Sequence, residues 1–369
     1  MKHNWEYKRL GDICDLYQPK TIAASELVED GEYDVYGANG IIGKFTRYNH
    51  EFPEILLTCR GATCGTINIS NPKSWINGNA MVIHSKSSEL LFAYLKYAMT
   101  ALDYSNIITG AAQPQITRQS LAPTNIPLPP MEVQEQIVAE LDKINETIED
   151  CRELLRNLDA LAQSLFYDTF GNPITNPKGW EVKKLSDECL DVVDGDHSAP
   201  PKTDKGVPFI TISNIDKTRN SIDFSDTFFV PQSYYDGLKD NRKARNGDVL
   251  YTVTGSYGVT VLIENLPKFC FQRHIGLIRP KATLNSVFLS YWGRSASIKA
   301  YADTVATGIA QKTVSLKSLR DFPIILPPLS LQEQFAARIE QIEAQKKAVE
   351  QTIAELQTLL DSRMDYWFN

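Results

Sequence analysis

The chain has 369 residues, of which 43% are hydrophobic and 22% charged, a globular composition and a length sufficient for two hydrophobic cores. It shows no apolar run near the roughly 18 residues of a membrane-spanning helix, no signal peptide and no CxxC pair, so we expect a cytoplasmic protein with reduced cysteines. The net charge is −7, but residues 131–170 hold 10 acidic and 3 basic groups while 171–329 hold 16 acidic and 20 basic ones, so the acidity does not exclude a DNA partner.

The first 130 residues predict a domain that contains several strands. WEYKRLGDICDL (5–16) places a tryptophan at the start of a candidate strand. ILLTCRGATCGTI (55–67) predicts an apolar strand, a glycine-containing turn and a second strand. The passage TGAAQPQITRQSLAPTNIPLPPMEVQEQ (109–136) follows, and its two consecutive prolines suit the entry of a helix but not its interior. We therefore end the first domain at residue 130.

A long helix is predicted over 131–170. Its apolar stripe has heptad spacing and consists of Leu141, Ile144, Ile148, Cys151, Leu155, Leu158, Ala162 and Leu165. The sequence GNP at 171–173 ends this helix. A helix with one apolar stripe must bury that stripe against a partner.

The second half of the chain repeats the plan of the first. WEVKKLSDECLDV (180–192) resembles 5–16, and VLYTVTGSYGVTV (249–261) resembles 55–67. The passage at 307–334 matches 109–136 at 13 of 28 positions without a gap, at an offset of 198. A second heptad helix is predicted over 330–369, with one polar interruption at Lys346. Such a duplication predicts two domains, 1–130 and 171–329, each followed by a long helix.

Two arrangements of the long helices are open at this point. Each helix could pack on its own domain, or the two could pair as an antiparallel coiled coil. Their matching register and length favour the pair. We therefore expect an α+β fold with two α/β domains, separated by two long helices and related by a pseudo-two-fold internal repeat.

The sequence lacks the usual catalytic motifs. It contains no Walker A sequence, no GxSxG, no HExxH and no zinc spacing of cysteine and histidine. The strings EYK (6–8) and EVK (181–183) fit a Glu-x-Lys nuclease site, but this pattern is short and common by chance. We therefore predict a binding protein, with no directly bound cofactor and no metal site.

Polar and basic residues gather in glycine-containing loops, which is typical of surfaces that read bases and hold phosphates. For any one of these residues a solvated turn is the slightly better explanation, but the set recurs at corresponding places in both halves, which favours DNA contact. The predicted DNA contacts of the first half are Asn39, Lys44, Arg47, Tyr48, Arg60, Asn77 and Asn79. Those of the second half are His197, Lys202, Lys205, Lys239, Arg242, Lys243, Arg245, Thr254, Ser256, Tyr257, Gln272, Arg273 and His274. For Gln113 and Gln311, in the two repeated passages, a structural capping role is favoured.

The repeated passages TGxAQ…LPP…QEQ, the stretch YGANGIIGKF and the tryptophan-opened strands together resemble the specificity subunit of a type I restriction-modification system, over essentially the whole chain. The resemblance implies two target-recognition domains and an antiparallel coiled coil. It also implies a non-catalytic subunit that reads a bipartite, asymmetric sequence in double-stranded DNA for phage defence. At Arg60 and Thr254 the loops depart from the family's Arg-Lys-Gly pattern, which weakens the base contacts implied there.

The resemblance also implies partners. Two modification subunits would bind S-adenosylmethionine and methylate adenine, and restriction subunits would use ATP and Mg²⁺. No membrane partner is expected. Two other functions remain open from the residues alone: a self-contained metal-dependent nuclease that uses Glu6 and Glu181, and a coiled-coil adaptor without a DNA role.

Overall fold

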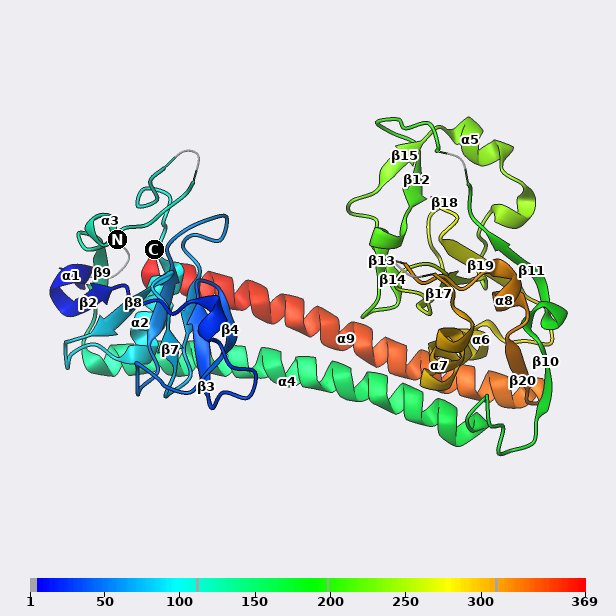
Figure 1. Ribbon diagram of the computed structural model, residues 1–369, viewed down its shortest axis with the longest axis horizontal. Coiled ribbons are helices and arrows are strands. Elements are labelled where there is room, and N and C mark those ends of the chain that lie inside the picture. The colour runs from blue at the N-terminus through cyan, green and yellow to red at the C-terminus, as the bar shows by residue number, and fades with distance from the viewer. Residues whose placement is uncertain (1–4, 111–112, 198, 309–310) are drawn as a thin grey trace. The chain divides into compact units, whose positions relative to one another are not determined.

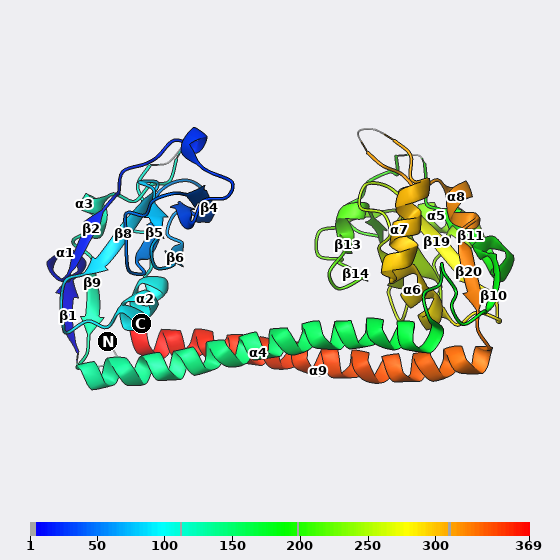
Figure 2. The same ribbon diagram turned by 60° about the horizontal axis from the view of Figure 1, so that its bottom comes forward.

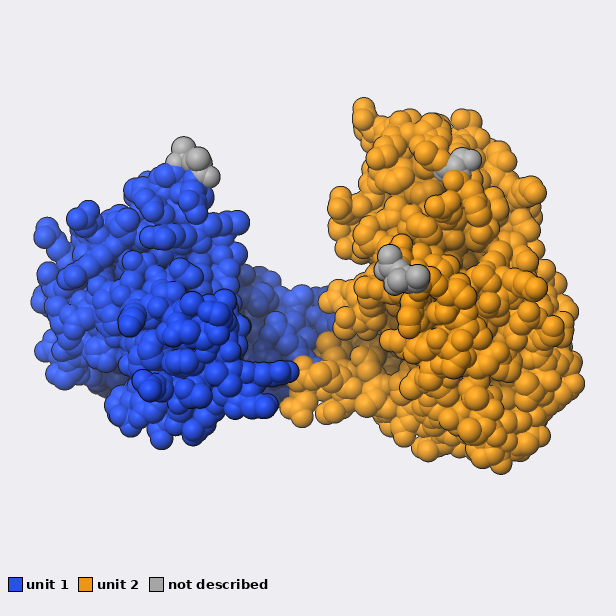
Figure 3. Space-filling view, viewed as in Figure 1, with its two compact units in different colours: residues 1–152, 350–369 blue, residues 153–349 orange. Residues whose placement is uncertain are grey.

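The computed structural model describes residues 5–110, 113–197, 199–308 and 311–369. The chain divides into two compact units, coloured separately in Figure 3. Unit 1 comprises residues 1–152 and 350–369, and unit 2 comprises residues 153–349. Two helices of 40 residues, α4 (Met131–Phe170) and α9 (Leu329–Phe368), each contribute one part to either unit. The third and fourth positions of each TGxAQ sequence, 111–112 and 309–310, lie outside the described residues.

Unit 1 combines short strands with helix α2 (Phe92–Ala101), as labelled in Figure 1. Its strands are β1 (Glu6–Arg9), β2 (Cys14–Tyr17), β3 (Tyr33–Gly37), β4 (Gly40–Phe45), β5 (Ile55–Thr58), β6 (Ile67–Ile69), β7 (Trp75–Ile76), β8 (Ala80–Ser85) and β9 (Asn125–Leu128). Its shorter helices are α1 (Leu10–Ile13), the 3₁₀ turn η1 (Ala24–Glu26) and α3 (Arg118–Leu121).

Three sheets make up unit 1. A four-stranded antiparallel sheet has the order β2-β8-β5-β6, and every residue of the central strand β5 is buried. In a three-stranded sheet, β3 pairs antiparallel with β4 and parallel with β7. β1 pairs with β9, so the first and last strands of this domain lie side by side.

Unit 2 contains more elements than unit 1. Its strands are β10 (Glu181–Lys184), β11 (Cys189–Asp194), β12 (Val207–Ile210), β13 (Ile215–Asp216), β14 (Ser221–Ile222), β15 (Phe228–Val230), β16 (Val249–Thr252), β17 (Thr260–Leu262), β18 (Cys270–Phe271), β19 (Ile275–Pro280) and β20 (Pro323–Leu326). Its helices are α5 (Gln232–Gly237), α6 (Ser286–Arg294), α7 (Ala296–Val305), α8 (Leu316–Arg320) and the 3₁₀ turns η2 (Leu185–Glu188), η3 (Ile212–Asn214) and η4 (Asp240–Arg242).

The two units share one topology, which confirms the predicted internal repeat. The sheet β11-β19-β16-β17 matches β2-β8-β5-β6, and β10 pairs with β20 as β1 pairs with β9. The sheet β15-β12-β18 also repeats the mixture of one antiparallel and one parallel pairing found in β4-β3-β7. The hairpin β13–β14, helix α5 and the turn η4 lie between β12 and β16, and account for much of the greater length of the second copy.

Within each unit the parts of α4 and α9 run antiparallel, as the heptad register predicted (Figure 2). In unit 1, the guanidinium group of Arg363 donates to the Glu140 carboxylate, and Trp367 Nε1 donates to Glu140 Oε2 at 2.9 Å. In unit 2, Lys346 Nζ lies 2.8 Å from Asp159 Oδ1. The polar interruption of the heptad pattern at Lys346 is therefore filled by an ion pair between the helices.

A buried glutamine joins the start of each long helix to its domain. Gln134 is fully buried; its amide group donates to the carbonyls of Glu89 (2.7 Å) and Pro129 (2.9 Å) and accepts from the Leu91 N–H (2.9 Å). Gln332 makes the equivalent contacts in unit 2, to Thr283 (3.4 Å), Pro327 (2.9 Å) and Asn285 (2.8 Å). Buried polar groups require such partners, so these contacts fix the angle at which each helix leaves its domain.

Candidate nucleic-acid interface

The loop that follows β5 contacts both Asn39 and the repeated passage in unit 1. The amide nitrogen of Asn39 donates to Thr63 Oγ1 at 2.6 Å, and its amide oxygen accepts from Thr58 Oγ1 at 2.9 Å. The loop after β5 also contacts the repeated passage, because the Gly61 N–H donates to the Pro114 carbonyl at 3.1 Å and Arg60 forms a β-bridge with Gln115. Gly61 has a φ of +86°, which a residue with a side chain rarely adopts. The exposed side chains of Asn39 and Arg60 thus belong to one surface.

The other predicted contacts of unit 1 differ in their accessibility. Lys44, Arg47, Tyr48 and Asn79 are exposed; Lys44 lies 3.8 Å from Asp34, and Tyr48 packs edge-on against Tyr33. The prediction for Asn77 is wrong, because this residue is only 3% exposed and its amide oxygen accepts from the Ile22 N–H at 3.0 Å. Asn77 holds two loops together and does not reach the surface.

In unit 2 a cleft of about 360 Å³ brings together four predicted residues, His197, Thr254, Arg273 and His274. His197 Nε2 lies 2.7 Å from Asp194 Oδ2, and Arg273 Nε lies 3.4 Å from His274 Nε2. The cleft thus carries imidazole and guanidinium groups, which can donate to the O6 and N7 acceptors of guanine. Thr254 is the exception, because it is only 8% exposed and its hydroxyl accepts from Thr313 at 3.5 Å.

Gln272, Ser256 and Tyr257 lie close to this region. The Gln272 N–H donates to the Ile210 carbonyl at 3.0 Å, which places residue 272 at the end of β18. Ser256 accepts a hydrogen bond from Lys217 Nζ at 2.6 Å, and the Tyr257 hydroxyl donates to Asp303 at 2.6 Å. The latter two side chains therefore line a second and larger cleft of unit 2, of about 850 Å³.

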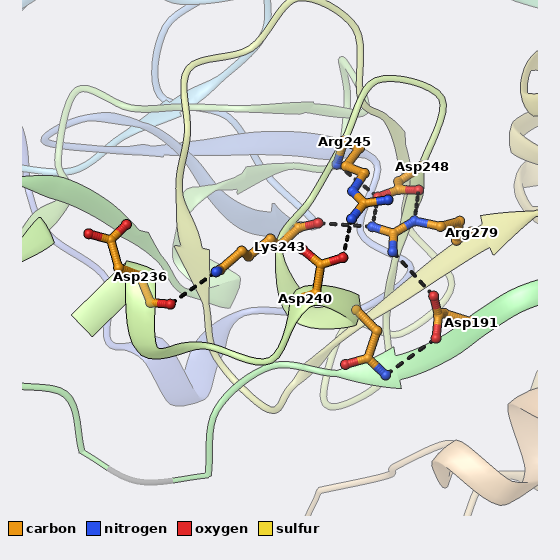
Figure 4. A network of polar contacts seen from close by, with 8 residues as sticks. Asp191, Asp236, Asp240, Lys243, Arg245, Asp248 and Arg279 are labelled. Atoms are coloured by element: carbon orange, nitrogen blue, oxygen red, sulfur yellow. Dashed lines mark hydrogen bonds and ion pairs between the residues drawn. The ribbon is translucent and has the colours of Figure 1, made fainter. Parts of the chain in front are cut away.

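The predicted basic cluster 239–245 is less positive than its sequence suggests. Arg242 lies 3.3 Å from Asp194. Arg245 is paired with Asp240, and Lys243 Nζ donates to the Asp236 carbonyl at 3.0 Å (Figure 4). Lys239 is exposed. Intramolecular partners thus hold three of the four side chains, so the expected concentration of four available charges is not found. Of the remaining lysines, Lys202 lies 4.7 Å above the Phe228 ring and Lys205 is exposed.

Arg279 organises the loop that carries this cluster. Its guanidinium group donates to both carboxylate oxygens of Asp248 (2.9 and 2.8 Å), to Asp191 (3.2 Å) and to the Lys243 carbonyl (2.9 Å), as Figure 4 shows. Asp248 is 2% exposed, and hydrogen bonding to this carboxylate raises the pKa of Arg279. A bidentate arginine–carboxylate pair is rigid, so the loop is fixed to strand β19.

The repeated glutamines Gln113 and Gln311 do not have the capping role that was favoured. Both are exposed, and no side-chain hydrogen bond of either is found among the residues that the structure describes. The tight turn instead uses the backbone, because Thr109 bridges Gln115 and Thr307 bridges Thr313. Gln311 lies on the walls of both clefts of unit 2.

The Glu-x-Lys strings have a structural explanation. Lys8 is paired with Glu6 at 2.5 Å on the edge of β1, and Lys183 lies 2.8 Å from the buried carboxylate of Glu188. These carboxylates keep the pKa values of both lysines raised. Over the described ranges, no three His, Cys, Asp or Glu side chains are grouped as metal ligands, and no helix is long and apolar enough to span a membrane.

Four cations that sequence reasoning missed line the larger cleft of unit 2: Lys217, Arg294, Lys299 and Lys312. They come from the turn of β13–β14, helix α6, helix α7 and the loop before α8, within residues 217–312. Only the turn composition of DKTRNS (216–221) could have drawn attention to one of them.

Comparison with known proteins agrees with this architecture. The chain is 22% identical to a putative type I specificity subunit of Mycoplasma pneumoniae, over 90% of this chain and 87% of that protein. It is 23% identical to the specificity subunit of the type I restriction enzyme EcoKI from Escherichia coli K12, over 86% and 68%. The fold resembles the S subunit of a type I restriction-modification system from M. genitalium, with a TM-score of 0.59, 14% identity and coverage of 99% and 96%.

A second solved structure, from a study of complex assembly in the type I R-M system, has a TM-score of 0.60 and 21% identity, and covers 98% of this chain and 96% of that one. The model of the family described as "Type I restriction modification DNA specificity domain" matches residues 2–158 and again residues 177–358. Since these two matches cover nearly the whole chain and coincide with the two copies of the fold, the protein belongs to the type I restriction-modification DNA specificity family.

Proposed function

We propose that this chain is the non-catalytic specificity subunit of a type I restriction-modification complex and that it reads a bipartite, asymmetric target in double-stranded DNA. One observation carries the proposal: a single topology occurs twice, and the two copies present different side chains from equivalent loops. Arg60 is exposed on the first copy, whereas Thr254 is buried at the equivalent β-bridge of the second. Two domains with one backbone and different surfaces suit two different half-sites.

We assign the recognition domains to 1–130 and 171–329 and the spacer helices to 131–170 and 330–369. The proposed contacts of the first domain are Asn39, Lys44, Arg47, Tyr48, Arg60 and Asn79. Those of the second are His197, Lys202, Lys205, Lys239, Ser256, Tyr257, Gln272, Arg273 and His274, with Arg242, Lys243 and Arg245 in a supporting role because each already has an intramolecular partner.

The internal repeat also bears on partners. Two copies of one fold in a single chain give two equivalent surfaces, which suit two identical modification subunits. We propose that these subunits bring S-adenosylmethionine, that restriction subunits bring ATP and Mg²⁺, and that the complex acts in the cytoplasm. The specificity subunit then contributes the choice of sequence and the scaffold.

The test is to co-express the full chain with the modification subunit encoded beside it and to sequence the methylated DNA. We expect methylated adenine in one bipartite motif, and a different motif when 171–329 is exchanged for the same region of a relative. Methylation without a bipartite motif would refute the proposal. Metal-dependent cleavage by the chain alone, abolished in a Glu6→Gln, Glu181→Gln variant, would instead support the nuclease, and sequence-indifferent DNA binding would support an adaptor.

A further inference from the structure

The larger cleft of unit 2 gathers four cations that no described carboxylate neutralises. The residues that line it come from the turn of the hairpin β13–β14, the loop 255–259, helices α6 and α7, the second part of α4 and residues 311–312. Of its cations, Lys217 donates to a hydroxyl, Ser256 Oγ, and Arg294 lies over the Tyr291 ring at 4.9 Å. Within the described part of the chain, no carboxylate lies within ion-pair distance of Lys217, Arg294, Lys299 or Lys312.

The acidic residues of this cleft are already engaged. Asp159 is paired with Lys346 at 2.8 Å, and Asp303 accepts a hydrogen bond from the Tyr257 hydroxyl at 2.6 Å. Arg294 has in addition a buried Nε without a hydrogen-bond partner. This situation contrasts with the cluster 239–245, in which intramolecular groups hold Arg242, Lys243 and Arg245. An external anion bound in the cleft can therefore pair with cations that no described carboxylate neutralises.

Unit 1 has a groove at the equivalent position with the opposite character. The offset of 198 relates Asn145 to Glu343, and these residues contact Tyr97 (3.0 Å) and Tyr291 (3.1 Å) respectively. The same offset relates Gln357 and Asp361 of the groove in unit 1 to Asp159 and Gln163 of the cleft in unit 2. The groove encloses about 430 Å³, and its charged residues are Lys96, Asp361 and Asp365. An anion is thus favoured in the cleft of unit 2 and disfavoured in the groove of unit 1.

We infer that the cleft of unit 2 binds the phosphate backbone of the DNA duplex, that Lys217, Lys299, Lys312 and Arg294 contact it, and that the equivalent groove of unit 1 does not bind phosphate. The inference rests on the proposed function and adds a phosphate-binding site to it. Phosphate contacts supply affinity for any sequence, so these four cations add sequence-independent affinity to the contacts already proposed for unit 2.

The test measures how the affinity of the full chain for a labelled 30-base-pair duplex of mixed sequence depends on salt. The variant is K217Q/K299Q/K312Q, whose three changes lie at exposed positions. Each lost phosphate contact lowers the slope of log K against log salt by roughly 0.9. We therefore expect a slope smaller by about 2 to 3 and binding weaker by about tenfold or more near 0.1 M salt.

The matched control is K268Q/R338Q/K347Q, which removes the same charge from exposed positions of unit 2 outside the cleft. K96Q tests the equivalent groove of unit 1. For both variants we expect a slope of log K against log salt within about 0.9 of the wild-type slope, which corresponds to one phosphate contact. Thermal unfolding of every variant shows whether it is folded.

Two results would overturn the inference. One is a folded cleft variant with the wild-type salt slope. The other is a cleft variant that binds the duplex normally but no longer co-purifies with the modification subunit, because the cleft would then hold a protein. Either result can occur while methylation still shows a bipartite motif, so a failure of this inference is distinct from a failure of the proposed function.

Discussion

The substitution Gln134→Leu tests whether the buried glutamine holds the long helix to its domain. Leucine has a similar size but no polar atoms. The change removes two donated bonds, to Glu89 and Pro129, and one accepted bond, from Leu91, at 2.7 to 2.9 Å. Because Gln134 is 0% exposed, water cannot easily replace these bonds.

The expected cost follows from these three contacts. A typical intramolecular hydrogen bond contributes about 1 kcal/mol, and a buried group left without a partner costs about 1–3 kcal/mol. Gln134→Leu should therefore lower the free energy of unfolding of unit 1 by about 3 kcal/mol or more, and its Tm by about 6–12 °C for a unit of this size. Gln332→Leu should cost slightly less in unit 2, because one of its three bonds is long, at 3.4 Å.

Urea unfolding and scanning calorimetry measure the effect, with the transition of each unit followed separately because two units need not unfold together. The repeated passages supply the control. Gln136 and Gln334 stand two positions further along and are exposed, so their leucine variants should stay within about 0.5 kcal/mol of the wild type. Equal effects at Gln134 and Gln136 would refute the proposed anchoring.

Three further predictions concern charged residues. Arg279→Met leaves buried Asp248 without its ion pair and should cost about 3–5 kcal/mol in urea unfolding, whereas the double variant with Asp248→Asn should recover part of this loss; no recovery would argue against the pair. The hydrogen bond from Arg363 lowers the pKa of Glu140, so its contribution is present above pH 4.5 and lost as the pH falls through the lowered value. The Tm difference between the wild type and Glu140→Gln should accordingly shrink in acid, and a constant difference would contradict this. Arg60→Ala should relax the methylated motif in one half-site, by about 1–3 kcal/mol of discrimination, and an unchanged motif would remove Arg60 from the interface.

The long-range plan of this protein is visible in its sequence because it depends on local signals. Heptad spacing and paired prolines define the helices, and the offset of 198 reveals the repeat. The partners of Gln134 lie up to 45 residues away, in the loop before α2, so its role needed the tertiary structure.

The candidate site was harder to predict, because exposure and pairing decide which loop residues are available. Asn77 lies between glycine-rich turns and reads as a surface residue, yet its partner Ile22 lies 55 positions earlier. In the cluster 239–245 the backbone carbonyl of Asp236, at the end of α5, accepts from Lys243, and the carboxylate of Asp240 pairs with Arg245. The cations of the larger cleft are brought together only by folding.

Unit 1 is built from two segments that lie far apart in the sequence, and this affects how it folds during synthesis. Leu360, Met364, Trp367 and Phe368, near the end of α9, pack against the core of a domain whose other residues come from the first 152 positions. The Trp367 ring stacks on Trp5 at 6.0 Å, joining residues that lie 362 positions apart. The domain that the ribosome makes first therefore cannot complete its core until residues 360–368 are translated. Unit 2 lies within residues 153–349, so it can finish folding earlier. During that interval the core residues that Leu360, Met364, Trp367 and Phe368 cover lack these contacts, and this apolar surface can bind a chaperone or a second nascent chain.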